Sequence, residues 1–353
     1  MTLFLKVSDR KPDPKRMEKA AKVLRKGGLV IFPTETVYGI GADATNPKAC
    51  AGIFSAKGRA RDNPLIVHVS SMEMAEKVGI IPRKYLRAIR KTWPAPITFV
   101  VVARPGLPKV VTAGLKTVCI RMPDNTVALS LIRKAGVPIA APSANPSTKP
   151  SATSGRHALM YFKGKVDVIL DAGKTKHGIE STILDLRNFK VLRPESFTVE
   201  QIAKAFSKRP RVTNQTRGLE DSKKITTPGM KYRHYSPASP LFLYEGKQEK
   251  LPEILKGMKD LAFIGSKETS RLIRSPNVKR IILGSRKNTA EMASNLFDAL
   301  IRLDSLKVRF GIVESFAEKG EGLAIMNRLR KASSHNSFKT GRELKKLLLQ
   351  GYR

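Results

Sequence analysis

Residues 13–41 read DPKRMEKAAKVLRKGGLVIFPTETVYGIG, and this stretch predicts an α/β fold. Asp13-Pro14 is typical of a helix start, because the aspartate caps the first turn and proline suits the first helical position. Apolar residues recur at helical spacing over 20–24, and Gly27-Gly28 then ends the helix. Residues 29–32 (Leu-Val-Ile-Phe) follow as a buried strand. Hydroxyl side chains and glycines come directly after this strand, where α/β proteins place ligands.

The alternation of helix and strand signals continues through the first half of the chain. Short apolar runs predict strands, and amphipathic segments between them predict helices. Thr198 with Gln201 three residues later has capping-box spacing and starts the last helix. We therefore expect an α/β domain over residues 1–206. Strands are expected at 65–69, 97–102, 117–122, 138–140, 166–170 and 182–184, and helices at 47–54, 71–78, 83–92, 125–135, 153–162 and 198–206.

Residues 207–240 differ in composition from the domain before them. They begin polar and unpatterned, and then two tyrosines, a histidine and a methionine fall within residues 230–235. A passive spacer seldom carries so many large side chains, and loops of this length are often lids or binding segments. We therefore interpret 207–240 as a linker that also serves as a lid or a binding segment.

The remaining residues, 241–353, predict a second and smaller domain. Strand-like runs and amphipathic helices alternate again, which favours a small doubly wound, Rossmann-like sheet. In the helix expected at 290–303, the apolar residues gather on one face. Strands are expected at 241–244, 261–264, 280–283 and 310–313, and a second helix at 322–331.

The composition restricts the class of protein. The formal net charge is +37 over 353 residues, and the excess of cations is spread along the whole chain. Two explanations stay open: contact with a polyanion such as tRNA, and basic faces that are only solvated. No apolar run reaches the ~18 residues of a membrane span, and the first residues do not resemble a secretory signal. The only cysteines, Cys50 and Cys119, favour a reducing cytoplasm over a disulfide framework.

Three cations, Lys57, Arg59 and Arg61, stand at alternate positions beside a glycine. Such a run suits a group with several negative oxygens, such as a triphosphate, and the alternative is a solvated helix end. A Walker A loop is absent from the sequence, because Ile179-Glu180 stands where Lys-Ser/Thr is needed after the glycines of 173–178. The scattered histidines and isolated cysteines offer no zinc ligand cluster. Any nucleotide must therefore be held by another device.

Polar residues at the ends of buried strands are the other candidates for a site. His68 lies among Leu, Ile and Val, and this position by itself favours a core histidine. Arg121 ends another buried strand, and a buried guanidinium needs an anion. A ligand carboxylate and a structural Asp or Glu both meet that need. Similar polar residues follow further predicted strands at Ser143, Asn145, Ser181 and Arg193.

Eight motifs stand in order along nearly the whole chain: Thr34–Gly39 (TETVYG), Lys57-Gly58-Arg59 with Asp62–Leu65 (DNPL), Arg121–Pro123, Pro142–Asn145 (PSAN), Gly178–Thr182 (GIEST), Pro228–Tyr235 (PGMKYRHY), Asn295–Leu300 (NLFDAL) and Ala324–Ala332 (AIMNRLRKA). The first five resemble the YrdC-type domain of threonylcarbamoyl-AMP synthases. The last three resemble the linker and the extra C-terminal domain of the two-domain members. This resemblance implies that the linker 207–240 folds over the active site, and we expect Tyr232 and His234 to cover the pocket. Small departures affect loops only, because Ala60, Ala95 and Glu195 stand where this family usually has proline or glycine.

The resemblance implies a fold and an activity. The fold is a twisted mixed-sheet YrdC-like domain followed by a smaller Rossmann-like domain. The activity joins L-threonine, bicarbonate or CO₂ and ATP, with Mg²⁺, into threonylcarbamoyl-adenylate and pyrophosphate, and no structural metal is expected. The product then serves a separate tRNA threonylcarbamoyl transferase complex, which modifies adenosine 37 of tRNA in the cytoplasm.

The resemblance also implies which residues bind the substrates. Around threonine it implies Thr36, His68, Arg121, Ala141 and Ser181. Around ATP it implies Lys57, Arg59, Asn63, Thr117, Ser143, Asn145, Ser151, Arg193 and His234. Lys57 and Arg59 are the expected catalytic cations, because this chemistry needs fixed positive charge at phosphoryl oxygens and no covalent nucleophile. Two other functions stay open: a non-catalytic, basic RNA-binding module, and a carbamoyl-adenylate enzyme with another amine acceptor.

Overall fold

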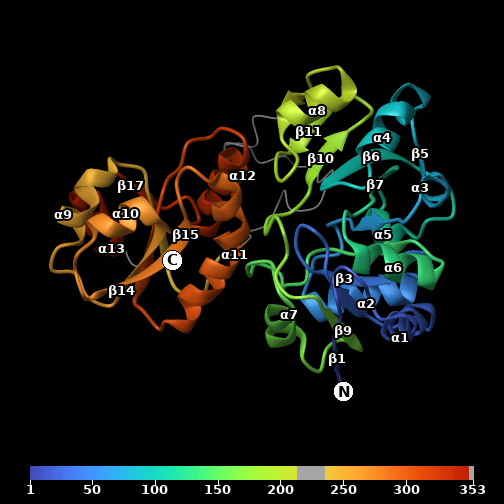
Figure 1. Cartoon of the computed structure of the whole chain (residues 1–353), viewed down its shortest axis with the longest axis horizontal. Helices are drawn as coiled ribbons and strands as arrows, with labels where there is room; N and C mark the ends of the chain where they lie inside the picture. Colours follow the sequence, from blue (N-terminus) through green and yellow to red (C-terminus); the bar gives the residue numbers. More distant parts are fainter. Residues whose placement is uncertain (213–234, 350–353) are drawn as a thin grey trace. The chain divides into compact units, whose positions relative to one another are not determined.

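A computed structural model describes residues 1–212 and 235–349 of the chain (Figure 1). The predicted covering residues Tyr232 and His234 lie outside these ranges. Of the helices within the described ranges, none is long and apolar enough to cross a membrane.

The chain forms two compact units, and each has its own sheet and its own apolar core. The first unit consists of Met1–Ser147 and Ser151–Tyr232. The second consists of Thr148–Pro150 and Arg233–Arg353. Both units mix helices and strands, as the α/β prediction requires (Figure 1).

The first unit is built on a mixed sheet, which has twelve strands among the described residues. In order across the sheet, these strands are β1 (Leu3–Lys6), β9 (Val168–Asp171), β2 (Val30–Phe32), β3 (Gly39–Asp43), β8 (Ile139–Ala140), β4 (Ile66–His68), β7 (Thr117–Arg121), β6 (Ile97–Ala103), β10 (Thr182–Asp185), β11 (Lys190–Arg193) and β12 (Arg211–Val212), with β5 (Gly79–Ile80) beside β6. Strand β7 runs parallel to β4 and antiparallel to β6. The predicted mixed sheet is therefore confirmed.

Helices pack against this sheet over two apolar clusters. Helices α1 and α6 supply Met17, Leu24 and Leu131 to one cluster, and α2 supplies Ile53 and Phe54 to the other. The helices of this unit are α1 (Pro14–Arg25), α2 (Pro47–Lys57), α3 (Met72–Val78), the 3₁₀ turn η1 (Arg83–Tyr85), α4 (Leu86–Thr92), α5 (Lys109–Thr112), α6 (Thr126–Ala135), α7 (Gly155–Phe162) and α8 (Val199–Phe206).

Local chemistry explains where the first helices begin and end. The Asp13 side chain accepts hydrogen bonds from the backbone N–H groups of Lys15 and Arg16 at 2.8 and 3.0 Å, as the sequence predicts. Asn46 caps α2 in the same way. Helix α2 ends at Gly58, whose φ of 60° is left-handed and suits glycine best. The cation run therefore starts at a helix end, as the sequence predicts.

The glycines after the first buried strand serve packing. Gly39 and Gly41 belong to β3, which pairs with β2. A Cβ atom on Gly41 would lie 2.7 Å from the Phe32 ring and 2.8 Å from a methyl group of Ile139. The close approach that the sequence suggests at Gly41 is thus made to neighbouring strands, and the polar loop ends at Tyr38.

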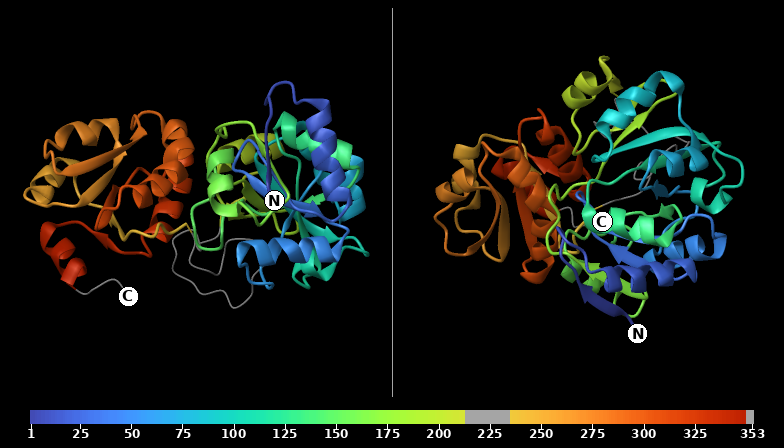
Figure 2. Two further views of the ribbon diagram at one scale, coloured as in Figure 1. Left: turned by 90° about the horizontal axis from the view of Figure 1, so that it is seen from below. Right: turned by 45° about the vertical axis from the view of Figure 1, so that its right-hand side comes forward.

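The second unit contains a parallel sheet with helices on both faces (Figure 2), and the predicted Rossmann-like arrangement is confirmed. Its strands, in order across the sheet, are β15 (Val278–Gly284), β14 (Leu261–Ser266), β16 (Phe310–Glu314), β13 (Leu241–Tyr244) and β17 (Ser337–Phe338). Its helices are the 3₁₀ turn η3 (Gln248–Lys250), α9 (Leu251–Leu255), α10 (Lys267–Leu272), α11 (Thr289–Ser305), α12 (Glu321–Ala332) and α13 (Gly341–Leu349). Helices α9 and α13 pack on the face that carries Phe242 and Phe263, whereas α11 and α12 pack together on the other face.

Candidate functional site

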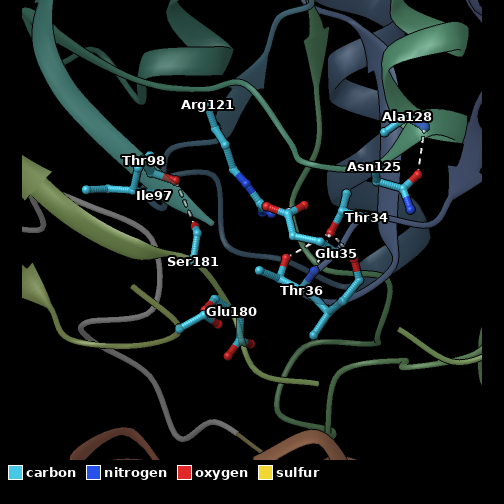
Figure 3. A network of polar contacts seen from close by, with 12 residues as sticks. Thr34, Glu35, Thr36, Ile97, Thr98, Arg121, Asn125, Ala128, Glu180 and Ser181 are labelled. Carbon is cyan, nitrogen blue, oxygen red and sulfur yellow. Dashed lines mark hydrogen bonds and ion pairs between the residues drawn. The ribbon is translucent and has the colours of Figure 1, made fainter. Parts of the chain in front are cut away.

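Neighbouring strands bring polar side chains together in the first unit (Figure 3). His68 ends β4 and Arg121 ends β7, and these two residues are paired in register. Thr98 of β6 is the partner of Arg121 on its other side. Ser181 directly precedes β10, and its Oγ lies 2.7 Å from Oγ1 of Thr98. The sheet thus assembles three predicted threonine-binding residues that are far apart in the sequence.

A fourth predicted residue, Thr36, lies in the loop between β2 and β3. The Thr34 hydroxyl accepts a hydrogen bond from the Thr36 N–H at 3.2 Å, and the two hydroxyl oxygens are 2.8 Å apart. A second segment holds this loop through its backbone. His177 N–H donates to the Glu35 carbonyl at 2.8 Å, and Gly178 N–H donates to the Thr36 carbonyl at 3.0 Å. The loop is therefore fixed before any ligand binds.

The buried guanidinium of Arg121 has an acidic partner within the chain. Glu35 Oε2 lies 2.7 Å from Arg121 Nη2, and the two side chains are only 2% and 5% exposed. Apart from this ion pair, Arg121 Nε and Nη2 and both Glu35 oxygens are buried without a hydrogen bond in the part of the chain that the structure describes. The sequence left two anions possible for Arg121, a structural acid and a ligand carboxylate. The structural acid is present as Glu35, and Arg121 Nε still offers a donor for a ligand carboxylate.

Sequence reasoning did not single out Glu35 as part of the site. The signal available was its place between two threonines, directly after a buried strand. A cavity of about 60 Å³ adjoins Glu35 and is also lined by Thr34 and Thr175. The Thr175 hydroxyl is buried and has no hydrogen-bond partner among the described residues. The cavity is thus lined by polar residues and has room for water.

His68 is buried and carries no charge at neutral pH. Burial and, second, the nearby Arg121 lower its pKa to about 3. Its Nδ1 lies 3.3 Å from the Ile66 carbonyl oxygen, and its ring packs edge-on against Phe32 with the centroids 6.0 Å apart. The imidazole therefore gives the site shape and polarity, as a core histidine does, and also adjoins Arg121.

The two predicted catalytic cations are both held by backbone carbonyls. Lys57 is the last residue of α2 and is 4% exposed, and its Nζ donates to the carbonyls of Ser143 and Asn145. Burial and, second, Arg59 lower the pKa of Lys57 well below its ordinary value. Arg59 donates from Nε to the Asn63 carbonyl at 3.2 Å. Lys57 is therefore not part of a merely solvated helix end, because its ammonium group is buried and hydrogen-bonded to carbonyls.

The loop after β8 carries three of the predicted ATP-binding residues. Ser143 Oγ donates to Asn145 Oδ1 at 2.6 Å, and Ser151 Oγ donates to Glu180 Oε1 at 2.8 Å. Glu180 also attracts the charge of Lys57. Arg193 donates from Nη2 to the Ser181 carbonyl at 2.7 Å. The ATP candidates are thereby joined to the threonine candidates through residues 180–181, and sequence reasoning missed Glu180.

Other predicted site residues lie farther from this cluster or outside the description. Thr117 starts β7 and Arg121 ends it, so four residue steps along the strand, about 13 Å, separate them. Asn63 is buried, and its Oδ1 has no hydrogen bond within the described residues. Ala141 directly follows β8. Its N–H donates to the carbonyl of Ile66 in β4, the strand that His68 ends. His234 lies in the segment that the structure does not describe.

Comparisons with known proteins identify the family of this chain. The threonylcarbamoyl-AMP synthase of Bacillus subtilis is 42% identical over 330 residues, which cover 91% of this chain and 93% of the relative. The chain belongs to the threonylcarbamoyl-AMP synthase family. The predicted family is thereby confirmed. A family model described as telomere recombination matches residues 22–195, and one described as threonylcarbamoyl-AMP synthase, C-terminal domain, matches residues 197–334.

Solved structures of a second relative have the same two-domain fold. The threonylcarbamoyl-AMP synthase of Pyrococcus abyssi is 40% identical over 356 residues, 96% of this chain and all of the relative. The crystal structure of P. abyssi Sua5 complexed with L-threonine has a TM-score of 0.88 at 38% identity and covers 96% of this chain and 99% of the other. The H234A/Y235A variant of the same protein gives a TM-score of 0.89 at 38% identity, with 96% and 98% covered.

Proposed function

We propose that this chain is an L-threonylcarbamoyladenylate synthase, which forms threonylcarbamoyl-AMP and pyrophosphate from L-threonine, bicarbonate or CO₂, and ATP. The observation that carries the proposal is the buried Arg121 guanidinium, whose Nε makes no hydrogen bond among the described residues, in the polar cluster that Figure 3 shows. A buried guanidinium with an unused donor suits a ligand carboxylate. A relative of 38% identity has been solved with L-threonine bound.

The reaction needs alignment and charge more than covalent chemistry. The threonine amine adds to CO₂ and loses a proton, which gives a carbamate. A carbamate oxygen then bonds to the α-phosphorus of ATP, the bond from that phosphorus to the β-phosphate bridge breaks, and pyrophosphate leaves. Arg121 holds the threonine carboxylate, and Lys57 and Arg59 lie toward the phosphates. Because two of the three Lys57 protons are bonded to carbonyls, Lys57 both builds the loop and supplies charge.

We propose Mg²⁺ as a companion of ATP rather than a resident of the protein. Mg²⁺ is usually bound through one or two carboxylates together with substrate phosphates. Among residues 1–212 and 235–349, no group of three or more His, Cys, Asp or Glu side chains is arranged to hold a metal ion. Glu180, bonded to Ser151, is the buried carboxylate beside the phosphate-binding candidates and fits a single-carboxylate contact.

We further propose that the product passes to a separate tRNA threonylcarbamoyl transferase complex in the cytoplasm. The net charge of +37 supports contact with tRNA by electrostatic attraction, although solvated basic faces explain it equally well. This part of the proposal concerns partners and is independent of the chemistry at Arg121.

Pyrophosphate release tests the proposed function directly. The full chain is incubated with ATP, Mg²⁺, bicarbonate and L-threonine, and each component is omitted in turn. Release that depends on threonine supports the synthase, and release that serine supports equally well points to another amine acceptor. No release, together with strongly salt-dependent RNA binding, indicates the RNA-binding module instead.

A further inference from the structure

The subsite around Arg121 is electrically balanced before a substrate enters. The positive guanidinium and the negative Glu35 carboxylate are 2.7 Å apart, and both are buried. His68 is neutral, because burial and Arg121 hold its pKa near 3. Burial also lowers the pKa of His177, whose backbone holds Glu35. A ligand that brings one net negative charge therefore leaves a buried charge uncompensated, whereas a zwitterion does not.

Hydrogen bonds hold the backbone at Glu35 in place. The carbonyl of Glu35 accepts a hydrogen bond from His177 N–H at 2.8 Å, and the next carbonyl, of Thr36, accepts one from Gly178 N–H at 3.0 Å. The side chain then reaches Arg121 Nη2, as Figure 3 shows. Glu35 thus pairs with Nη2 of the guanidinium, while Arg121 Nε makes no hydrogen bond within the described residues.

We propose that Glu35 is a positioning and selectivity residue of the amino-acid subsite. It holds the Arg121 guanidinium and cancels its charge, so that the subsite accepts a zwitterionic α-amino acid and rejects an anion that lacks the ammonium group. The inference rests on the proposed function, because it takes L-threonine as the ligand of Arg121. Glu35 itself touches no reacting atom in this proposal and acts through Arg121.

The test compares L-threonine with 3-hydroxybutyrate, which is threonine without its amino group. Binding of each to the full chain is measured by isothermal titration calorimetry for the wild type and for Glu35→Gln. Glutamine has nearly the same shape and keeps an oxygen toward Arg121, but it removes the charge. In Glu35→Gln, we expect the ratio of the 3-hydroxybutyrate Kd to the threonine Kd to fall at least about tenfold. The reason is the lost repulsion between the Glu35 charge and the net negative ligand: two unit charges roughly 5 Å apart interact strongly enough for such a change at an effective dielectric constant of about 20.

Two further variants separate this role from a merely structural one. Asp185→Asn neutralises another buried carboxylate of the same unit, which pairs with Arg187 rather than Arg121, and it should leave the ratio unchanged. Glu35→Asp keeps the charge but shortens the side chain. It should weaken threonine binding by about threefold or more and leave the ratio near the wild-type value, because the subsite stays neutral.

The outcomes decide the inference and the proposed function separately. Failure of the wild type to bind threonine overturns the proposed function. Wild-type threonine binding with an unchanged ratio in Glu35→Gln overturns the inference alone, and so does an equal fall of the ratio in Asp185→Asn. If Glu35→Gln does not fold, Glu35→Asp decides: a preserved ratio with weaker threonine binding supports the inference, and a shifted ratio or an unchanged threonine affinity overturns it.

Discussion

Replacement of Lys57 with methionine tests whether this cation builds the nucleotide loop as well as attracting phosphate. Its buried ammonium group donates to the carbonyls of Ser143 and Asn145. Methionine fills a similar volume but donates nothing, so two carbonyls lose their donor at about 1–3 kcal/mol each. Part of this loss is recovered, because burial disfavours the charge, as the lowered pKa of Lys57 indicates. We expect the free energy of unfolding to fall by about 2 kcal/mol.

Thermal unfolding and steady-state kinetics measure this effect. For a unit of this size, about 2 kcal/mol lowers Tm by roughly 4–8 °C. The KM for ATP should rise at least about tenfold, because Ser143 and Asn145 lose their anchor, while the KM for threonine changes much less. The matched control is Arg61→Met, which removes an exposed cation of the same run. Its stability should stay within about 0.5 kcal/mol of the wild type.

The result that refutes this reasoning is also specific. If Lys57→Met keeps the wild-type stability and only weakens ATP binding, Lys57 is a phosphate ligand and its bonds to the loop contribute nothing measurable. If Arg61→Met destabilises the protein as much as Lys57→Met does, the effect belongs to the charge of the run and not to the buried contacts.

Three other predictions follow from the same site and from the second unit. Folding lowers the pKa of His68 from its ordinary 6.5 to about 3, so between these pH values the unfolded state binds more protons than the folded state. The free energy of unfolding therefore decreases as the pH falls through this window, by about 2 kcal/mol at pH 5. His68→Gln should flatten urea-derived stability between pH 5 and 7, and a wild-type slope in the variant would contradict this. Arg121→Lys should weaken threonine binding at least about tenfold in calorimetry, because a point charge replaces a planar guanidinium, and wild-type affinity would show the assignment to be wrong. Glu314→Ala should destabilise the second unit by about 3–5 kcal/mol, since the fully buried carboxylate pairs with Arg286 and accepts from Thr269 at 2.7 Å; a denaturation midpoint equal to that of the wild type would exclude such a role.

Local signals in the sequence were sufficient for many of the elements, though not for all. The cap of Asp13, the capping box of Thr198 and Gln201, and the apolar face of α11 depend on residues within one or two turns, and all are found where they are expected. Short elements such as β3 and β17 escaped, because two to five residues carry too little periodicity, and tertiary pairing decides them.

The sequence by itself determined the α/β class, the two domains' sheet types and, through its ordered motifs, the family. It also pointed to Arg121 and Lys57 as charges that need partners. Only the tertiary structure decided which partners they have. The acceptors of Lys57 lie 86 and 88 residues away, and Glu35 lies in the loop after β2 whereas Arg121 ends β7. The physical reason is burial: a charge taken out of water must be bonded, and the fold determines which oxygens are within reach.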